Sequence, residues 1–212
     1  MKWEEIVYRK SSGEIGSAKE IQKDLKKRLK PNRYTHTLGV VQTALHLATV
    51  YGSEVSQAVL AALLHDCAKY MSDEDKITLC REYDVEISVS EYKNPSLLHA
   101  KCGAIRANVS YGVEDEEVLH AIRVHTTGVP KMNLLDKIIF ISDYIEPNRD
   151  QAPHLEELRA LADTDLDQTA YLILKDTVEY LNQRKDQVMD PTTLQAYEYY
   201  ANLAQKRRED YE

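Results

Sequence analysis

The stretch Ala58-Val-Leu-Ala-Ala-Leu-Leu64 leads directly into His65 and Asp66. Seven consecutive apolar residues favour a helix buried in a protein core, so an imidazole and a carboxylate come at its end. Both groups are costly to remove from water unless a partner compensates them. A divalent metal ion would compensate both, because neutral imidazole binds transition metals and a carboxylate adds negative charge. The other interpretation is a salt-bridged pair that caps the helix.

Further ligands for such an ion must come from elsewhere in the chain, because neighbouring helical residues point about 100° apart. Taken singly, each candidate has an ordinary alternative. A lone His36 suits a surface or helix-capping position, and Asp143 suits a buried salt bridge or a solvent-facing stripe shared with Asp136. Asp143 is nevertheless notable, because nearly all its neighbours in the segment 134–145 are apolar. The candidates at helix ends or inside apolar helices are His36, His99, His125 and Asp143.

The rest of the chain predicts helices. Apolar residues recur at helical spacing in ten segments, and no segment shows sustained alternation of apolar and polar residues. The nearest approach to a strand is Val85 to Val89, in a polar stretch that we expect to be a loop. The fold class is therefore all-α: a single-domain bundle of about nine or ten helices over residues 17–212, after a loose, polar lead-in at 1–16. The expected helices are 17–30, 33–51, 54–69, 72–83, 95–111, 115–125, 134–146, 154–162, 165–184 and 190–208.

The composition excludes several classes of function. The chain has 212 residues with 27 basic and 35 acidic side chains, which gives a net charge of −8. It has no basic block, glycine-rich phosphate loop or paired zinc-ribbon cysteines, so we expect no nucleic-acid partner. No apolar run approaches the roughly 20 residues that span a bilayer, so we expect no membrane association. Three cysteines, an odd number, suggest reduced thiols and a cytoplasmic location.

The order His36, His65-Asp66, His99, His125, Asp143 is more specific than any of its members. On an all-α background it resembles the HD superfamily of metal-dependent phosphohydrolases. Three local strings are similar to signatures of the YqeK family, bacterial HD-domain hydrolases that cleave bis(5′-nucleosyl) tetraphosphates symmetrically. The resemblance covers roughly residues 17–185. The strings are Arg33-Tyr-Thr-His-Thr-Leu-Gly-Val40, His65-Asp-Cys-Ala-Lys69 and Ser142-Asp-Tyr-Ile-Glu-Pro-Asn-Arg149.

The resemblance implies metal ligands. The resemblance implies that one ion, iron, is held by four ligands: His36, His65, Asp66 and Asp143. His99 and His125 stand where related proteins hold a second ion, or they bind substrate phosphate instead. A ligand set rich in nitrogen with carboxylates suits iron, manganese or zinc better than magnesium. In a two-metal site Asp66 would bridge both ions.

Three cations are candidates for binding phosphate, and each has the alternative of a solvated surface residue. Lys69 lies one turn beyond Asp66, and we assign it with Asp66 to catalysis. Arg33 shares a helix face with His36, and Arg149 has the planar guanidinium suited to bidentate phosphate contact. Glu146 could orient a ligand imidazole or be an exposed acid.

The implied reaction is the hydrolysis of diadenosine tetraphosphate to two nucleoside diphosphates, so the expected partner is a dinucleoside polyphosphate or a nucleoside diphosphate. The same site could serve a nucleotidase or a cyclic-dinucleotide phosphodiesterase, and a degenerate HD domain would only bind nucleotides. The segment 171–177, with Lys175, could border the adenosine pocket or be plain core and surface. Three tyrosines could contact a second copy in a homodimer or the core: Tyr197, Tyr199 and Tyr200. We expect structural roles for His46, His120 and His154.

Overall fold

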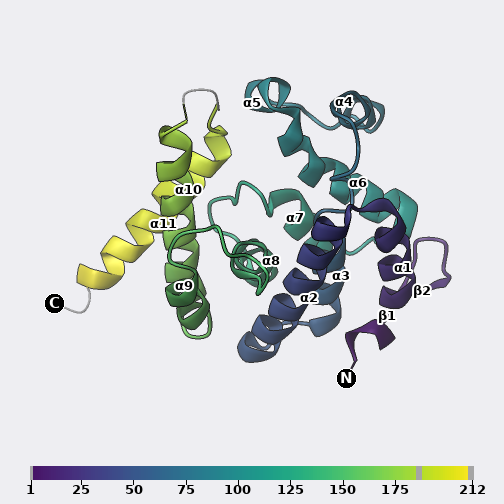
Figure 1. Cartoon of the computed structure of the whole chain (residues 1–212), viewed down its shortest axis with the longest axis horizontal. Coiled ribbons are helices and arrows are strands. Elements are labelled where there is room, and N and C mark those ends of the chain that lie inside the picture. Colours follow the sequence, from purple (N-terminus) through teal and green to yellow (C-terminus); the bar gives the residue numbers. More distant parts are fainter. Residues whose placement is uncertain (1, 185–187, 210–212) are drawn as a thin grey trace.

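A computed structural model describes residues 2–184 and 188–209 of the chain (Figure 1). Over these residues the chain forms eleven α-helices, two short 3-10 helices and one antiparallel two-stranded sheet, which confirms the all-α class. The elements are η1 (Trp3–Glu5), β1 (Val7–Arg9), β2 (Ile15–Ser17), α1 (Ala18–Arg28), α2 (Pro31–Tyr51), α3 (Val55–Leu64), α4 (Asp73–Glu82), α5 (Val89–Lys93), η2 (Pro95–Leu98), α6 (His99–Tyr111), α7 (Glu116–Val124), α8 (Leu134–Ile145), α9 (Leu155–Ala162), α10 (Leu166–Asn182) and α11 (Pro191–Glu209).

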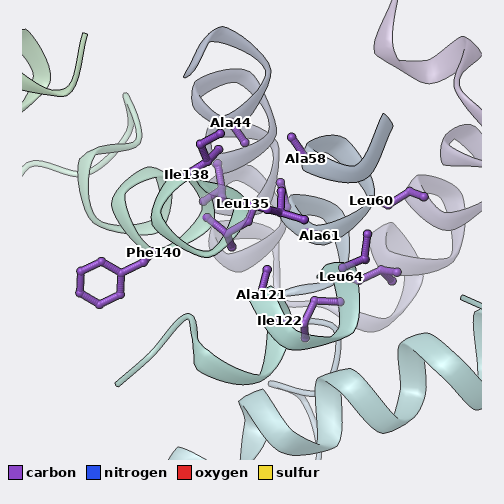
Figure 2. Close-up of a cluster of buried hydrophobic side chains, with 14 of the residues drawn as sticks. Ala44, Ala58, Leu60, Ala61, Leu64, Ala121, Ile122, Leu135, Ile138 and Phe140 are labelled. Atoms are coloured by element: carbon purple, nitrogen blue, oxygen red, sulfur yellow. The ribbon is translucent and has the colours of Figure 1, made fainter. Parts of the chain in front are cut away.

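Helix α3 is the centre of the core. It packs against α2, α7 and α8, and every residue from Ala58 to Leu64 is buried. A helix enclosed on all sides needs no polar face, which explains the unbroken apolar run. Figure 2 shows Ala58, Ala61 and Leu64 among side chains of the neighbouring helices. This packing fixes the end of α3, and the two polar residues that follow it, at one place in the bundle.

Helix α8 connects the core to the C-terminal helices. It contacts α2 and α7 on one side and α10 on the other, with the α10–α11 pair lying beyond it in Figure 1. Tyr200 of α11 is buried, and the ring of Tyr197 stacks on Tyr171 of α10 with centroids 6.1 Å apart. Tyr199 is partly buried against the same core. These tyrosines therefore contact the core, and a homodimer stays a prediction.

The start of α8 removes one of the alternatives for Asp143. Asn133 caps the helix by accepting from the backbone N–H of Asp136, and the Asp136 side chain accepts from the Asn133 N–H in return. Asp136 is 1% exposed and also lies 2.8 Å from Nδ1 of His120. Asp136 therefore belongs to a helix cap, and a solvent-facing stripe shared with Asp143 is excluded.

Two segments differ from the sequence predictions. The described part of the predicted loose lead-in, residues 2–16, is ordered: β1 and β2 pair in register Tyr8 with Gly16, Ile6 is buried, and the Tyr8 hydroxyl donates to the carbonyl of Tyr111. Strands of three residues are too short to show alternation in the sequence. The stretch 84–94, predicted as a loop, contains the short helix α5, which begins with a capping box formed by Ser88 and Glu91.

The end of α3 also differs from its prediction. The sequence predicts a helix to residue 69, whereas α3 ends at Leu64 and residues 65–70 form tight turns. The three cysteines are free and buried: Cys67, Cys80 and Cys102. Among the helices in the described part of the chain, none has the length and apolar character required to cross a membrane.

Candidate metal centre

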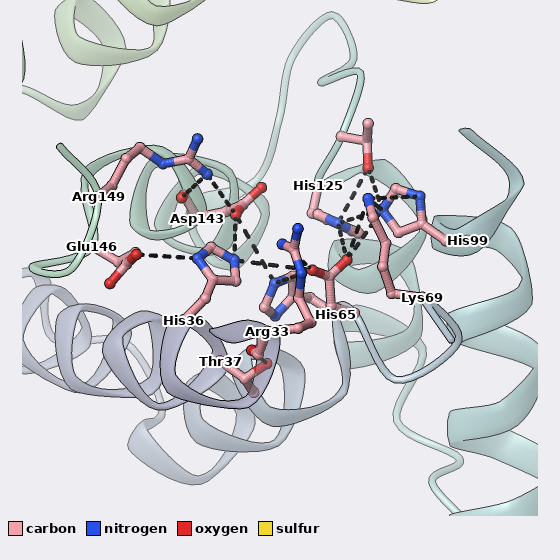
Figure 3. A network of polar contacts seen from close by, with 12 residues as sticks. Arg33, His36, Thr37, His65, Lys69, His99, His125, Asp143, Glu146 and Arg149 are labelled. Atoms are coloured by element: carbon pink, nitrogen blue, oxygen red, sulfur yellow. Dashed lines mark hydrogen bonds and ion pairs between the residues drawn. The ribbon is translucent and has the colours of Figure 1, made fainter. Parts of the chain in front are cut away.

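The six predicted ligands meet at one end of the core (Figure 3). They come from different elements, so each element fixes only one or two of them. Helix α2 carries His36 in its second turn, and the turn after α3 carries the doublet. The N-terminal residue of α6 is His99, His125 directly follows α7, and α8 carries Asp143 in its last turn.

Four of these side chains form what we name the Asp143 group: His36, His65, Asp66 and Asp143. Oδ1 of Asp143 lies 3.0 Å from Nε2 of His36 and 4.0 Å from Nε2 of His65. Oδ2 of Asp66 lies 3.5 Å from Nε2 of His65 and 3.9 Å from Nε2 of His36. Ligand atoms of His36, His65 and Asp66 thus all lie within 4.8 Å of one another, and the Asp143 carboxylate adjoins both imidazoles.

Three side chains form a second set, the His99 group: Asp66, His99 and His125. Oδ1 of Asp66 lies 3.2 Å from Nε2 of His99 and 3.8 Å from Nε2 of His125. The two Nε2 atoms are 3.2 Å apart. Asp66 therefore presents one carboxylate oxygen to each group, which is the arrangement of a carboxylate that bridges two ions.

All four histidines use Nδ1 in the same way. His65, His99 and His125 each place Nδ1 2.6–2.7 Å from the main-chain carbonyl three residues earlier, and His36 places Nδ1 3.2 Å from Oε1 of Glu146. Carbonyl and carboxylate oxygens only accept, so each Nδ1 must carry the proton that it donates. The unprotonated Nε2 of a neutral imidazole is then free to bind a metal.

Several polar atoms at the centre of the cluster are buried without a hydrogen bond to any described residue. They include Nε2 of His36, Nε2 of His65 and Oδ1 of Asp66. The side chains of His65 and Asp66 are 0% and 3% exposed, so water cannot compensate them from outside. Orphaned buried polar atoms are rare in folded proteins, and a divalent cation would satisfy all three. The residues present therefore fit a metal centre.

The pKa values within the cluster reflect two opposing effects, burial and the charges of neighbouring side chains. Burial alone would raise the pKa of Asp66 and of Asp143, but the surrounding imidazoles hold both pKa values below their ordinary range. Burial lowers the pKa of His36, yet the carboxylates of Asp143 and Asp66 outweigh it and raise the pKa overall. Burial lowers the pKa of His99 to about 3. Both carboxylates are therefore anionic and His99 is neutral at pH 7.

Comparison with known proteins identifies the family. The HD domain family model matches residues 33–148, a range that contains all six predicted ligands. The symmetrical bis(5′-nucleosyl)-tetraphosphatase of Halalkalibacterium halodurans is 46% identical over 82% of this chain and 91% of that protein. The protein of the same name from Staphylococcus aureus is 38% identical over 92% of this chain and 98% of its own length. The chain belongs to the family of HD-domain symmetrical bis(5′-nucleosyl)-tetraphosphatases.

A solved structure agrees with this family assignment. The crystal structure of a predicted HD superfamily hydrolase involved in NAD metabolism from Clostridium acetobutylicum has a TM-score of 0.84 and 38% identity to this chain. The match covers 89% of this chain and 98% of that one. The resemblance that the sequence suggested, to HD-domain phosphohydrolases of the YqeK type, is thereby confirmed.

The three cations predicted to bind phosphate lie beside the candidate metal centre. Nη1 of Arg33 is 2.7 Å from Oδ2 of Asp66. Nζ of Lys69 is 3.8 Å from Oδ1 of Asp66 and 3.2 Å from Nε2 of His99. Nη2 of Arg149 donates to the carbonyl of Asp143, 2.9 Å away. Burial lowers the pKa of Lys69, although its side chain is 33% exposed at the mouth of the site.

Three further residues support the site. Glu146 is 2% exposed and contacts His36, so its alternative as an exposed acid is excluded. Sequence reasoning missed Thr126, whose Oγ1 lies 3.1 Å from Nε2 of both His99 and His125. Arg159 ends a stretch, Leu155-Glu-Glu-Leu-Arg159, that also fits the family, but sequence reasoning assigned it no role; it donates to the carbonyls of residues 145, 146 and 149 and so fixes the turn after α8. For Thr126 the sequence held no signal except its position after His125.

The remaining histidines lie outside the metal centre. His46 contacts Asp163, His120 contacts Asp136 and His154 contacts Asp176, at 2.7–3.0 Å. His154 nevertheless lines a cavity of about 670 Å³ that reaches the metal centre through Thr126 and Arg149. We name this the α10 cavity, because α10 supplies one wall. Asp176 and Thr177 line it, whereas Lys175 does not. Its other principal walls are Tyr144, Pro153 and Tyr180.

Proposed function

We propose that this chain hydrolyses diadenosine tetraphosphate, and bis(5′-nucleosyl) tetraphosphates in general, symmetrically to two nucleoside diphosphates. The observation that carries the proposal is the pair of candidate ligand groups that share Asp66, together with three nearby cations. Arg33 and Lys69 contact Asp66, and Arg149 contacts Asp143. Such a centre suits attack of water on a phosphoanhydride. The names of the relatives support the choice of substrate.

The Asp143 group would hold one ion and the His99 group a second, with Asp66 between them. The neutral state of His99 favours metal over phosphate as its ligand, because its Nδ1 proton is already donated to the carbonyl of Ser96. We propose iron as the native metal and manganese as the alternative, since imidazole and carboxylate ligands suit both. When bound, the ions would supply hydroxide near neutral pH and withdraw charge from phosphoryl oxygens.

The chain's own cations would bind the polyphosphate. Arg149 lies at one end of the network in Figure 3 and Lys69 at the other, with Arg33 between them. In the reaction the water oxygen bonds to one central phosphorus, and the bond from that phosphorus to the bridging oxygen breaks. The electron pair stays on the bridging oxygen, which leaves with the other diphosphate. Lys69 and Arg33 would neutralise the charge that develops there.

The α10 cavity would hold one nucleoside of the substrate. It joins the metal centre through Arg149, and its walls combine aromatic rings with hydrogen-bonding groups, as nucleoside sites do. Tyr144 and Tyr180 offer ring surface for a base. Asp176 and His154, which contact each other at 3.0 Å, offer an acceptor and a donor.

Product analysis tests the proposal. The purified protein, loaded with Fe²⁺ or Mn²⁺, is incubated separately with diadenosine tetraphosphate, a deoxynucleotide and a cyclic dinucleotide. We expect ADP as the sole nucleotide product from the first and little turnover of the others. ATP and AMP as products, or consumption of only the second or third substrate, would refute symmetrical cleavage. A domain that only binds nucleotides would consume none of the three.

A further inference from the structure

A second cavity reaches the metal centre from another direction. It lies where α1 leads into α2, against the turn after the His65–Asp66 doublet, and has a volume of about 280 Å³. We name it the α1–α2 groove. It has no lining residue in common with the α10 cavity. Its walls are Leu29, Lys30, Asn32, Arg33, Lys69 and Tyr70.

The groove reaches the candidate metal centre at Asp66. Two of its lining residues, Arg33 and Lys69, are the ones that contact Asp66, at 2.7 and 3.8 Å. The α10 cavity approaches the same centre through Arg149, which contacts Asp143, and Thr126. Both cavities therefore border the candidate metal ligands, the α1–α2 groove with two cations and the α10 cavity with one.

The charge of the groove is unlike that of the protein as a whole. Three of its six lining residues are cations and none is acidic, although the net charge of the chain is −8. The guanidinium group of Arg106 also lies over the ring of Tyr70, at 5.5 Å, whereas that of Arg28, at 5.9 Å, is paired with Asp24 at 2.8 Å. A concave surface lined by charges of one sign concentrates ligands of the other sign. The groove therefore suits a polyanion.

A neighbouring cavity shows the contrast. It also touches the metal centre, through Thr126, but Glu91 and Asp190 line it along with Lys101 and Arg123. Lys101 is already paired with Glu91 at 2.8 Å. That cavity has no surplus of positive charge for a diphosphate.

A substrate cleaved at its middle bond places one half on each side of the reacting phosphorus. With one nucleoside diphosphate in the α10 cavity, the other half must extend elsewhere. We propose that the α1–α2 groove binds the second nucleoside diphosphate of the substrate, with its phosphates at Arg33 and Lys69 and its nucleoside against Lys30 and Tyr70. This inference rests on the proposed function and adds a second nucleotide subsite to it.

Calorimetric titration of the metal-loaded enzyme with ADP, one of the two identical products, tests this assignment. We expect two ADP molecules per chain. The variant Lys30→Glu reverses an exposed charge in the groove without touching a residue of the metal centre. It should weaken one of the two ADP sites by about three- to tenfold and leave the other within about twofold. The matched control is Lys23→Glu, an exposed lysine of α1 that does not line the groove.

Hydrolysis kinetics provide the second measurement. Lys30→Glu should lower kcat/KM for diadenosine tetraphosphate by about three- to tenfold, mainly through KM, while Lys23→Glu changes it less than about twofold. A single ADP per chain in the unaltered enzyme, or equal effects of the two reversals, would overturn the second subsite. Failure of the proposed function is separately visible, because no ADP would then form from diadenosine tetraphosphate.

Discussion

The two ligand groups that share Asp66 differ in charge and in how one histidine is held: His36 contacts a side chain, whereas His65, His99 and His125 contact main-chain carbonyls. The Asp143 group contains two carboxylates, and the carboxylate of Glu146 orients its His36. The His99 group contains one carboxylate, and main-chain carbonyls at helix ends orient both of its imidazoles. More negative charge attracts a cation more strongly, so the Asp143 group should hold its ion more tightly. The His99 group depends less on other side chains, because backbone geometry fixes it.

Removing the charge that both groups share should have the largest effect. In Asp66→Asn the side chain keeps its shape but loses its negative charge, and one of its two oxygens becomes an NH2 group that cannot bind a metal, so the bridge between the groups is lost. We expect loss of both ions, measured by metal analysis of the purified protein. Hydrolysis of diadenosine tetraphosphate should fall by about a thousandfold or more.

The matched control for that variant is Asp163→Asn. Asp163 is 49% exposed and contacts His46, away from the metal centre. Metal content and activity should stay at the level of the unaltered protein. An Asp66→Asn protein that keeps two ions per chain would contradict the bridging role of this carboxylate.

Substitutions unique to each group should separate the two ions. Asp143→Asn removes a carboxylate only from the Asp143 group, and His99→Gln removes a nitrogen ligand only from the His99 group. Each variant should fall from two ions per chain to about one, and activity should fall about a hundredfold or more, because both ions serve the reaction.

Metal affinity distinguishes these two variants from each other. The ion that remains in His99→Gln should be held more tightly than the one in Asp143→Asn, as competition with a chelator measures. His46→Gln, an exposed histidine outside the site, is the control. Two ions retained in His99→Gln would show that the His99 group does not bind metal and would return its histidines to phosphate binding.

A substitution of Gly39, the α2 residue that faces Glu146, should have a smaller effect, confined to the metal affinity of the Asp143 group. A Cβ on Gly39 would meet Oε2 of Glu146 and come within 2.7 Å of Nδ2 of Asn148. In an ordinary helix interior, alanine is about 1 kcal/mol more favourable than glycine. Here Gly39→Ala should instead displace Glu146 and loosen His36, which lowers metal affinity of the Asp143 group about 10- to 100-fold.

Two variants sharpen the interpretation of Gly39→Ala. Glu146→Gln should reproduce the loss of affinity without any steric change, because the amide orients His36 less firmly. Thr35→Ala, at an exposed position of α2, should change neither affinity nor stability by more than about 0.5 kcal/mol. A Gly39→Ala protein with unaltered affinity and higher stability would mean that Glu146 has room to move.

The sequence led to the six candidate ligands but not to the residues that support them. His65 directly follows the apolar helix α3 and Asp143 lies within the apolar helix α8, so both polar residues stand out in the sequence. The order of the six residues matched a family. Thr126 contacts His99 across 27 positions of sequence, and no local pattern records such a contact. Whether the six bind metal stays a proposal.

The short elements were missed for a related reason. Helix α5 has five residues, too few for helical periodicity, and only the capping pair Ser88 and Glu91 signals it. The β1–β2 hairpin depends on contacts with residues about 100 positions away, such as Tyr8 with Tyr111. Elements stabilised mainly by distant contacts leave little trace in local sequence.

Proton binding in the metal-free protein provides the most delicate comparison of the two groups. The carboxylates around His36 raise its pKa above the ordinary 6.5, whereas burial lowers the pKa of His99 to about 3. NMR of the histidine rings should therefore show His36 titrating above pH 6.5 and His99 neutral throughout the neutral range. A raised folded pKa stabilises the fold below pH 6.5, and this contribution disappears as the pH rises through that folded value. The stability difference between the metal-free protein and His36→Gln should shrink accordingly towards alkaline pH, and a difference that grows instead would contradict the charge balance of the Asp143 group.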